Sequence, residues 1–302
     1  MDRRELLGRI VTFPIIAAGL AEDLLAGNYR SIFRGQGIEF DGVRRYERGD
    51  DIRTIDWNAS ARFGRPYVKT YREERELSVF IVLDCSASMF TGSGLTRFEQ
   101  GLMAAALIAF SAERAGQQTG ALFYDREITR IFPPGKGRRH IMTILQSALD
   151  YSPAGRGSGL GAAILGAGRL LRRRSLAVIV SDFLAVNWER ELEELARRHD
   201  VIALRLCDPM DAELPAAGLI PLEDPETAAR IHAPSLSESF RSAWAQWHGD
   251  RADLWEALCR KSGAASLELS TAADAAESLF RFFGGRRGAA FHPVSRRAGS
   301  GA

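Results

Sequence analysis

The chain alternates between apolar runs typical of buried strands and amphipathic stretches typical of helices. Ser78–Leu83 and Leu176–Val180 are rich in β-branched residues without polar interruption, as in parallel strands buried on both faces. Further strands are expected at 120–124, 128–132, 201–206 and 264–269, and helices at 97–115, 137–149, 160–173, 188–198 and up to about 283. This alternation predicts an α/β fold with a doubly wound, mainly parallel sheet and helices on both faces.

The segments outside this alternation suggest how the domain is bounded. Residues 1–76 form a smaller α+β segment, with an amphipathic helix over 2–26 followed by charged turns and short strands at 38–40 and 65–71. The main domain is expected over 77–284. It contains a proline-rich interruption at 209–234, which we interpret as an inserted β-hairpin at 219–232. The tail 285–302 is rich in Gly and Arg and is expected to be disordered.

Composition narrows the class of protein. Hydrophobic residues make up 46% of the chain, enough for a large buried core, and the net charge of +2 does not favour a nucleic-acid-binding protein. The three cysteines are widely spaced, which indicates neither a disulfide framework nor a zinc site. The apolar stretch 10–25 is interrupted by acidic residues, so we expect a soluble, cytoplasmic protein without a transmembrane segment, although an amphipathic helix on a membrane surface stays open.

Oxygen-bearing side chains gather where two predicted strands end. Asp84, Ser86 and Ser88 alternate directly after the strand 78–83, so an extended loop directs all three to one side. Asp182 follows the strand 176–180 at the corresponding place, and Ser158 lies in a glycine-rich loop before a helix. Ligands bind at the carboxyl ends of strands in such sheets, and carboxylate and hydroxyl oxygens suit Mg²⁺ or Mn²⁺.

Two resemblances add to this interpretation. Asp84-Cys85-Ser86-Ala87-Ser88 resembles the Asp-x-Ser-x-Ser motif of the metal-ion-dependent adhesion site of von Willebrand factor type A domains. The resemblance covers Leu77 to about Phe283 and implies a metal held by Asp84, Ser86, Ser88, Ser158 and Asp182. Ser158 stands where such domains usually carry threonine, and Gly159 where an acidic residue is frequent. Ser158 could equally be the N-cap of the following helix, and Ser181 could support Asp182 by a hydrogen bond.

The second resemblance lies upstream, and with it the likeness covers nearly the whole chain. It rests on the segments Gly37–Arg44, Tyr46–Asp51, Ile55–Arg62 and Glu73–Glu76, which are similar to a bacterial family, the domain-of-unknown-function family fifty-eight. Members are often encoded beside MoxR-type AAA+ ATPases. The resemblance therefore implies an adaptor or a chaperone-like partner of such an ATPase in assembling or activating other proteins.

Three functions follow from these observations. The first is a metal-dependent protein-binding module, in which an acidic group of a partner, such as an AAA+ ATPase or its client, completes the shell of the ion. The second is a metal-free scaffold that binds through residues 29–76. The third, a haloacid dehalogenase-like phosphohydrolase, requires a second aspartate two residues after Asp84, where the chain has Ser86. Because no Walker loop or serine-hydrolase elbow occurs either, we expect no enzymatic activity.

Several other residues receive structural interpretations. Asp50 and Asp51 suit turn or helix caps, Arg44 suits an ion pair, and Trp57 suits burial against a sheet edge. Trp244, Trp247 and Trp255 have spacings that suit one buried face of a helix. The five histidines show no metal-binding spacing.

Overall fold

The computed structural model describes Leu6, Gly8, Phe13 and residues 39–72, 78–153, 157–226 and 228–285. The chain forms two compact units, residues 31–76 and the remainder. Leu6 and Phe13 are buried in the core of the larger unit. The rest of the helix expected over 2–26, and the tail beyond Gly285, lie outside the described residues.

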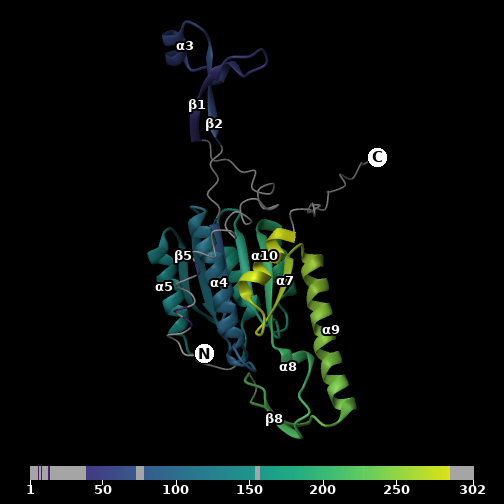
Figure 1. The fold of residues 1–302 in the computed structure, drawn as a ribbon. Coiled ribbons are helices and arrows are strands. Elements are labelled where there is room, and N and C mark those ends of the chain that lie inside the picture. Colours follow the sequence, from purple (N-terminus) through teal and green to yellow (C-terminus); the bar gives the residue numbers. More distant parts are fainter. Residues whose placement is uncertain are drawn as a thin grey trace, which may run out of the picture. The chain divides into compact units, whose positions relative to one another are not determined.

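The larger unit is built on a sheet of six strands in the order β10-β7-β6-β3-β4-β5 (Figure 1). Neighbouring strands are parallel, except that β5 pairs antiparallel with β4. The mainly parallel sheet is therefore confirmed. The strands are β3 Ser78–Asp84, β4 Gln118–Tyr124, β5 Ile128–Gly135, β6 Leu176–Ser181, β7 Asp200–Cys207 and β10 Ala265–Ser270.

Helices cover both faces of this sheet, as a doubly wound fold requires. One face carries α4 Arg97–Arg114, α5 Arg138–Leu149 and α10 Ala275–Gly285, whose buried side chains share one hydrophobic cluster. The other face carries α6 Leu160–Leu170, α7 Glu189–Arg198 and α9 Glu238–Ser262, which share a second cluster. Two short helices, η2 Ala87–Phe90 and α8 Pro209–Ala212, lie in the connections.

Strand β3 shows why its sequence has no polar interruption. Val79, Ile81 and Leu83 belong to the cluster under α4, whereas Phe80 and Val82 belong to the cluster under α6. Alternate side chains of a strand point to opposite faces, so a strand covered on both faces must be apolar throughout. After Ser78 at its start, the next polar side chain of β3 is therefore Asp84, at the end of the strand.

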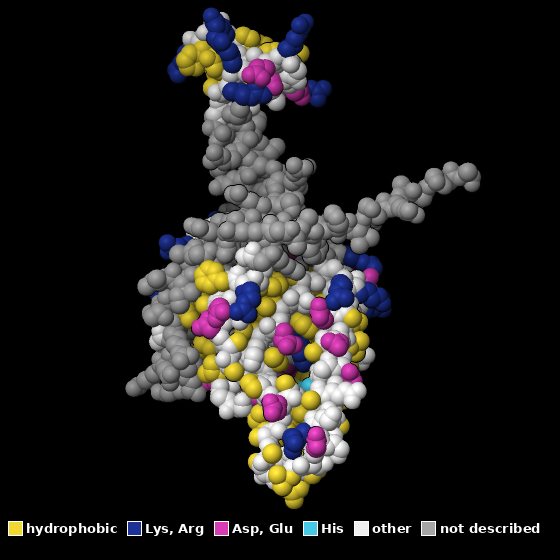
Figure 2. Space-filling model, turned by 45° about the vertical axis from the view of Figure 1, so that its right-hand side comes forward, with side chains coloured by type: hydrophobic (Ala, Val, Ile, Leu, Met, Phe, Trp, Pro, Cys, Tyr) yellow, Lys and Arg dark blue, Asp and Glu magenta, His cyan; other side chains and the backbone are white. Residues whose placement is uncertain are grey.

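The interruption after β7 contains the predicted hairpin. Strands β8 Leu219–Glu223 and β9 Arg230–Pro234 pair antiparallel in a sheet of their own. Leu219, Ile231 and Leu236 are exposed there, and Figure 2 shows hydrophobic side chains gathered at this end of the larger unit. The base of the hairpin is fixed by Ser235, whose hydroxyl donates to the Gly218 carbonyl at 2.8 Å.

The smaller unit contains a two-stranded antiparallel sheet of β1 Glu39–Arg45 and β2 Tyr67–Arg72, with η1 Ile52–Thr54 and α3 Trp57–Phe63 between the strands. Asp51 and Asp56 cap the two helices through their carboxylates. Asp50 accepts from the Glu47 amide and forms a two-pronged ion pair with Arg44 at 2.6 and 2.8 Å. The caps and the Arg44 ion pair are thus confirmed.

Two tryptophan predictions are wrong. Trp57 has 71% of its surface exposed, because α3 is short and buries no residue. Trp247 is 51% exposed, whereas Trp255 on the same helix is 5% exposed and packs near Phe183. At 3.6 residues per turn, the separation between these two tryptophans overshoots two full turns by about 80°, which carries Trp247 off the face that Trp255 occupies.

None of the helices among the described residues is both long and apolar enough to cross a bilayer. The three cysteines are free, with Cys85 and Cys259 buried and Cys207 half-buried.

Candidate metal centre

The site lies between the carboxyl ends of the neighbouring strands β3 and β6. The chain continues from these two strands to opposite faces of the sheet. Both strands are parallel neighbours, with Leu83 opposite Val180, so Asp84 and Asp182 leave the same edge of the sheet. The helix that follows β3 covers one face of the sheet and the helix that follows β6 covers the other. In α/β proteins such a divergence marks the crevice in which ligands bind, at the carboxyl ends of the strands. The corresponding place in this chain, around Asp84 and Asp182, is called the crevice below.

Asp84 is fully buried and held by three donors. Its Oδ1 accepts from the Ser86 amide at 2.9 Å, and its Oδ2 accepts from the Ser181 hydroxyl at 2.6 Å and from the Tyr124 hydroxyl at 2.9 Å. Ser181 therefore supports Asp84, whereas the sequence suggests support for Asp182. Tyr124 ends β4 directly opposite Asp84, a relationship that the sequence pattern does not reveal.

Ser86 and Ser88 direct their hydroxyls to the same place, with their Oγ atoms 3.2 Å apart. Both residues are buried. Ser86 occupies the N-cap position of η2, yet its side chain makes no capping bond. The Ser86 hydroxyl therefore does not act as the cap of η2.

Asp182 has one occupied and one unoccupied carboxylate oxygen. Oδ1 accepts from the Leu184 amide at 3.0 Å. Oδ2 is buried, and it has no hydrogen-bond partner among the described residues. Water cannot readily replace that partner, because the residue is only 4% exposed. A buried carboxylate oxygen without a partner is costly, so a cation or a proton is the chemically reasonable complement.

The Ser158 hydroxyl is also buried without a hydrogen-bond partner in the described part of the chain. The N-cap of α6 is Gly159, and no side chain caps this helix. The alternative prediction that Ser158 caps the helix is therefore wrong. Its free hydroxyl is instead available to a ligand.

The glycines beside Ser158 are required by the backbone. Gly157 has a φ of +96°, which side-chain-bearing residues rarely adopt. A Cβ on Gly159 would overlap the carbonyl oxygen of Arg126, and the Gly159 amide donates to the Asp125 carbonyl at 2.7 Å. An acidic residue at position 159, as in similar domains, would therefore collide with the backbone after β4.

The electrostatics of the crevice favour a positive ligand. Burial, and then the neighbouring Asp182, raise the pKa of Asp84 to about 7, although hydrogen bonds from Ser181 and Ser86 oppose this shift. Burial also raises the pKa of Asp182, whereas Ser88, the Leu184 amide and Arg97 each lower it. Two buried carboxyls that disfavour each other's charge are stabilised by a cation between them.

The donor set fits a hard divalent ion. It combines the carboxylates of Asp84 and Asp182 with the hydroxyls of Ser86, Ser88 and Ser158. Two of these oxygens, Asp182 Oδ2 and Ser158 Oγ, lack hydrogen-bond partners within the described ranges. No group of three His, Cys, Asp or Glu side chains in that part of the chain could hold a metal by itself. Any ion here must therefore depend on serine hydroxyls and on additional oxygen ligands, as Mg²⁺ does.

Glu226 reaches the same crevice from the β8–β9 loop. Its Oε1 accepts from the Ser88 amide at 2.9 Å, and its Oε2 accepts from the Gly157 amide. The sequence analysis missed this residue, because 138 positions separate it from Ser88. The charge of Glu226 contributes to the raised pKa of Asp182.

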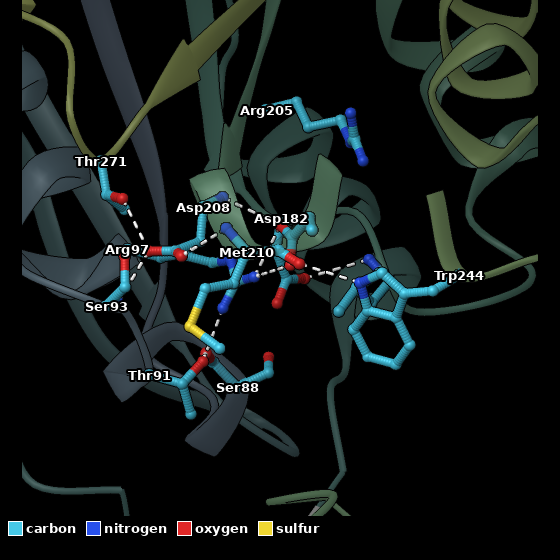
Figure 3. Close-up of polar contacts among 12 residues, drawn as sticks. Ser88, Thr91, Ser93, Arg97, Asp182, Arg205, Asp208, Met210, Trp244 and Thr271 are labelled. Carbon is cyan, nitrogen blue, oxygen red and sulfur yellow. Dashed lines mark hydrogen bonds and ion pairs between the residues drawn. The ribbon is translucent and has the colours of Figure 1, made fainter. Parts of the chain in front are cut away.

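A polar network continues from the crevice to the connection after β7 (Figure 3). Arg97 donates to both oxygens of Asp211 at 2.6 and 2.7 Å and to the Thr91 hydroxyl at 2.6 Å. Asp208 accepts from the Ser93 amide, the Thr271 hydroxyl and the Met210 amide. Arg97 thus places a positive charge near Asp182 while remaining paired with Asp211.

Comparison with known proteins identifies the family. The family described as "Protein of unknown function DUF58" matches residues 42–252. The chain belongs to the DUF58 family. This DUF58 chain is 34% identical over 294 residues to the uncharacterized proteins Mb1516 of Mycobacterium bovis and Rv1480 of Mycobacterium tuberculosis, with 95% of the chain and 92% of each relative covered.

Solved structures similar to the DUF58 chain are more distant. The conserved hypothetical protein BatB from Bacteroides thetaiotaomicron is 16% identical, with a TM-score of 0.47 and 70% of the chain and 98% of BatB covered. Proximal thread matrix protein 1 from the mussel byssus, solved with a zinc-occupied MIDAS motif, is 14% identical with a TM-score of 0.33, covering 44% of the chain and 38% of that protein.

Proposed function

We propose that this DUF58 protein binds Mg²⁺ or Mn²⁺ through Asp84, Ser86, Ser88, Ser158 and Asp182 and uses the ion to hold an acidic group of a protein partner. The observation that carries the proposal is a pair of buried oxygens, Asp182 Oδ2 and Ser158 Oγ, that have no partner among the described residues. The charge of Asp182 acts on the fully buried Asp84, and Gly157, next to Ser158, shares the Glu226 carboxylate with Ser88. The resemblance of the Asp84–Ser88 motif to the von Willebrand factor type A adhesion site supports the same ion and role.

Ligand chemistry explains why such a site would serve binding rather than catalysis. Mg²⁺ needs about six oxygens, and the two carboxylates and three hydroxyls of this set supply one oxygen each, so a carboxylate of a partner can complete the shell. Ser86 stands where a phosphohydrolase would need an aspartate as general acid, and Asp84 already accepts three hydrogen bonds. We therefore propose a non-enzymatic, chaperone-like adaptor, with a MoxR-type AAA+ ATPase as partner and the cytoplasm as its location.

Titration calorimetry with Mn²⁺ and with Mg²⁺ tests the metal site. Asp182→Asn keeps an oxygen for the Leu184 amide and removes the negative charge, so it should abolish the binding measured for wild type. Asp253, an exposed residue of α9, provides a matched control, because Asp253→Asn makes the same chemical change outside the proposed ligand set. Equal affinities for wild type and Asp182→Asn would refute the site.

A pull-down with and without chelator tests the role of the ion. If the metal joins the chain to its partner, the AAA+ ATPase should co-purify with wild type only when Mn²⁺ or Mg²⁺ is present, and not with Asp182→Asn. Recovery of the same partner in the presence of chelator would contradict metal bridging.

A second candidate, a metal-free scaffold, is favoured by one observation on the smaller unit. Ile52, Trp57 and Phe63 expose 65%, 71% and 58% of their surfaces. Large exposed apolar side chains are typical of protein interaction sites when they lie together. If partner capture is lost in Trp57→Ala but unchanged in Asp182→Asn, the scaffold function is correct and the metal-dependent one is wrong.

A further inference from the structure

The β8–β9 hairpin brings a carboxylate of the chain itself to the mouth of the proposed metal site. Glu226 bonds the amide of Ser88 through one oxygen and the amide of Gly157 through the other. These amides belong to the two loops that carry Ser86, Ser88 and Ser158. One side chain therefore joins both ligand-bearing loops from a third segment, far away in the sequence.

The loop around Glu226 is held in shape by its own hydrogen bonds. Asp224 Oδ1 accepts from the Glu226 amide at 2.9 Å, the Asp224 amide donates to the Ala229 carbonyl at 2.8 Å, and the Ala228 amide donates to the Asp224 carbonyl at 2.7 Å. Ala228 adopts a positive φ of 59° to close this turn. The described residues on both sides of Glu226 are thus anchored by hydrogen bonds.

The charges around Glu226 call for a cation. Glu226 adds a third negative charge near Asp182, although Asp84, Asp182 and Glu226 do not by themselves form a group that could hold a metal without the serine hydroxyls. Arg97 approaches Asp182, but both of its terminal nitrogens are engaged by Asp211 and Thr91. Backbone amides can hold one carboxylate, yet they do not neutralise three like charges in a partly dehydrated site.

We infer that Glu226 is an acidic ligand which the chain supplies to its own metal ion, in the position that a carboxylate of the partner would take. The inference rests on the proposed metal site. It follows that the hairpin competes with the partner: an external acidic group can reach the ion only when the Glu226 loop leaves the Ser88 and Gly157 amides. The hairpin therefore sets the affinity with which an external acidic group binds the ion.

Water-proton relaxation with Mn²⁺ tests this inference directly, because it reports how many exchangeable water molecules the bound ion carries. In Glu226→Gln, the neutral amide oxygen binds the ion more weakly than a carboxylate, so water should take its place, the relaxivity of bound Mn²⁺ should rise and its affinity should fall by about tenfold, the scale of changes next to metal ligands. Glu223→Gln is the matched control on the same hairpin, since Glu223 pairs with exposed Arg230. It should leave both quantities unchanged.

Acetate provides a probe for the position that Glu226 leaves. In Glu226→Ala, millimolar acetate should lower the relaxivity of bound Mn²⁺ by displacing water, whereas wild type should not respond. If wild type and both Glu226 variants bind Mn²⁺ with the same affinity and relaxivity, while Asp182→Asn does not bind, the internal ligand is wrong and the metal site stands. If wild type itself fails to bind Mn²⁺, the proposed function and this inference are both overturned.

Discussion

The hydroxyl of Tyr124 donates a hydrogen bond of 2.9 Å to Oδ2 of Asp84, across adjacent parallel strands that end at the same level. Both residues are fully buried. The tyrosine thus fixes the carboxylate together with Ser181 on the neighbouring strand, whose hydroxyl donates to the same oxygen. Asp84 is oriented by the sheet itself, before any ligand is considered.

Tyr124→Phe should therefore lower both stability and metal affinity. The substitution leaves the ring in place and removes one donor from a buried carboxylate, which costs about 1–3 kcal/mol of unfolding free energy. Because the remaining donors hold Asp84 less firmly, Mn²⁺ should bind more weakly in calorimetry. Urea denaturation measures the loss of stability.

Tyr151→Phe separates the two effects. The Tyr151 hydroxyl donates to Asp125 at 2.7 Å, and the same atom is removed outside the proposed ligand set. This variant should lose stability and keep its Mn²⁺ affinity. If both variants weaken Mn²⁺ binding equally, Tyr124 has no special role at the site.

Gly159→Ala should destabilise the protein and disturb Ser158. Its Cβ would overlap the carbonyl group of Arg126, whose backbone atoms cannot move as a flexible side chain would. Overpacking of this kind costs about 1–3 kcal/mol, and the shifted loop should also weaken Mn²⁺ binding. Thermal and urea unfolding, followed by calorimetry, measure the two effects.

Gly168→Ala is the matched control for this change. Gly168 lies within α6, and a Cβ there would be 3.4 Å from a flexible Leu195 side chain. Alanine favours a helix over glycine by about 0.5–1 kcal/mol, so stability should be unchanged or slightly higher. A loss of stability as large as that of Gly159→Ala would show that the contact with Arg126 is not the cause.

The sequence could predict the two aspartates because their placement follows from general rules of α/β sheets. Asp84 and Asp182 each follow an apolar run, and parallel strands end at one edge. Glu226 could not be predicted, since its position depends on how the hairpin packs. The exposure of Trp57 was missed for a related reason: a pattern shows that a side chain is apolar, but not whether a surface exists to cover it.

Lower pH should destabilise the protein through His199. The ring is buried, and its two nitrogens have no hydrogen-bond partner within the described residues. Burial, with Arg198 and Arg174 nearby, lowers the pKa of His199 from 6.5 to about 4. Between these values the unfolded chain binds a proton that the folded chain does not, so stability falls as pH decreases through this window and is unaffected above it.

Urea denaturation at several pH values between about 4.5 and 7.5 checks this effect. His199→Leu should lose part of the dependence on pH below about 6.5, because the titrating group is absent from both states. His232→Leu makes the same change at an exposed position and should follow wild type. A wild-type curve that runs parallel to that of His199→Leu throughout would contradict the assignment.

The ion pair of Arg97 and Asp211 gives the last prediction, because it joins the metal crevice to the connection after β7. Only 10% and 16% of the two side chains are exposed. Arg97→Met leaves the half-buried Asp211 carboxylate with the Asp208 amide but without a positive partner, so the unfolding free energy should fall by at most about 3–5 kcal/mol. In the double variant Arg97→Met, Asp211→Leu, no unpaired charge remains, and most of this loss should be recovered.

Arg230→Met, which breaks the exposed pair with Glu223, should cost at most about 1 kcal/mol. Urea denaturation of Arg97→Met, Asp211→Leu, the double variant and the control measures these changes in unfolding free energy. If the losses of the two single variants add up to the loss of the double variant, the pair is not coupled.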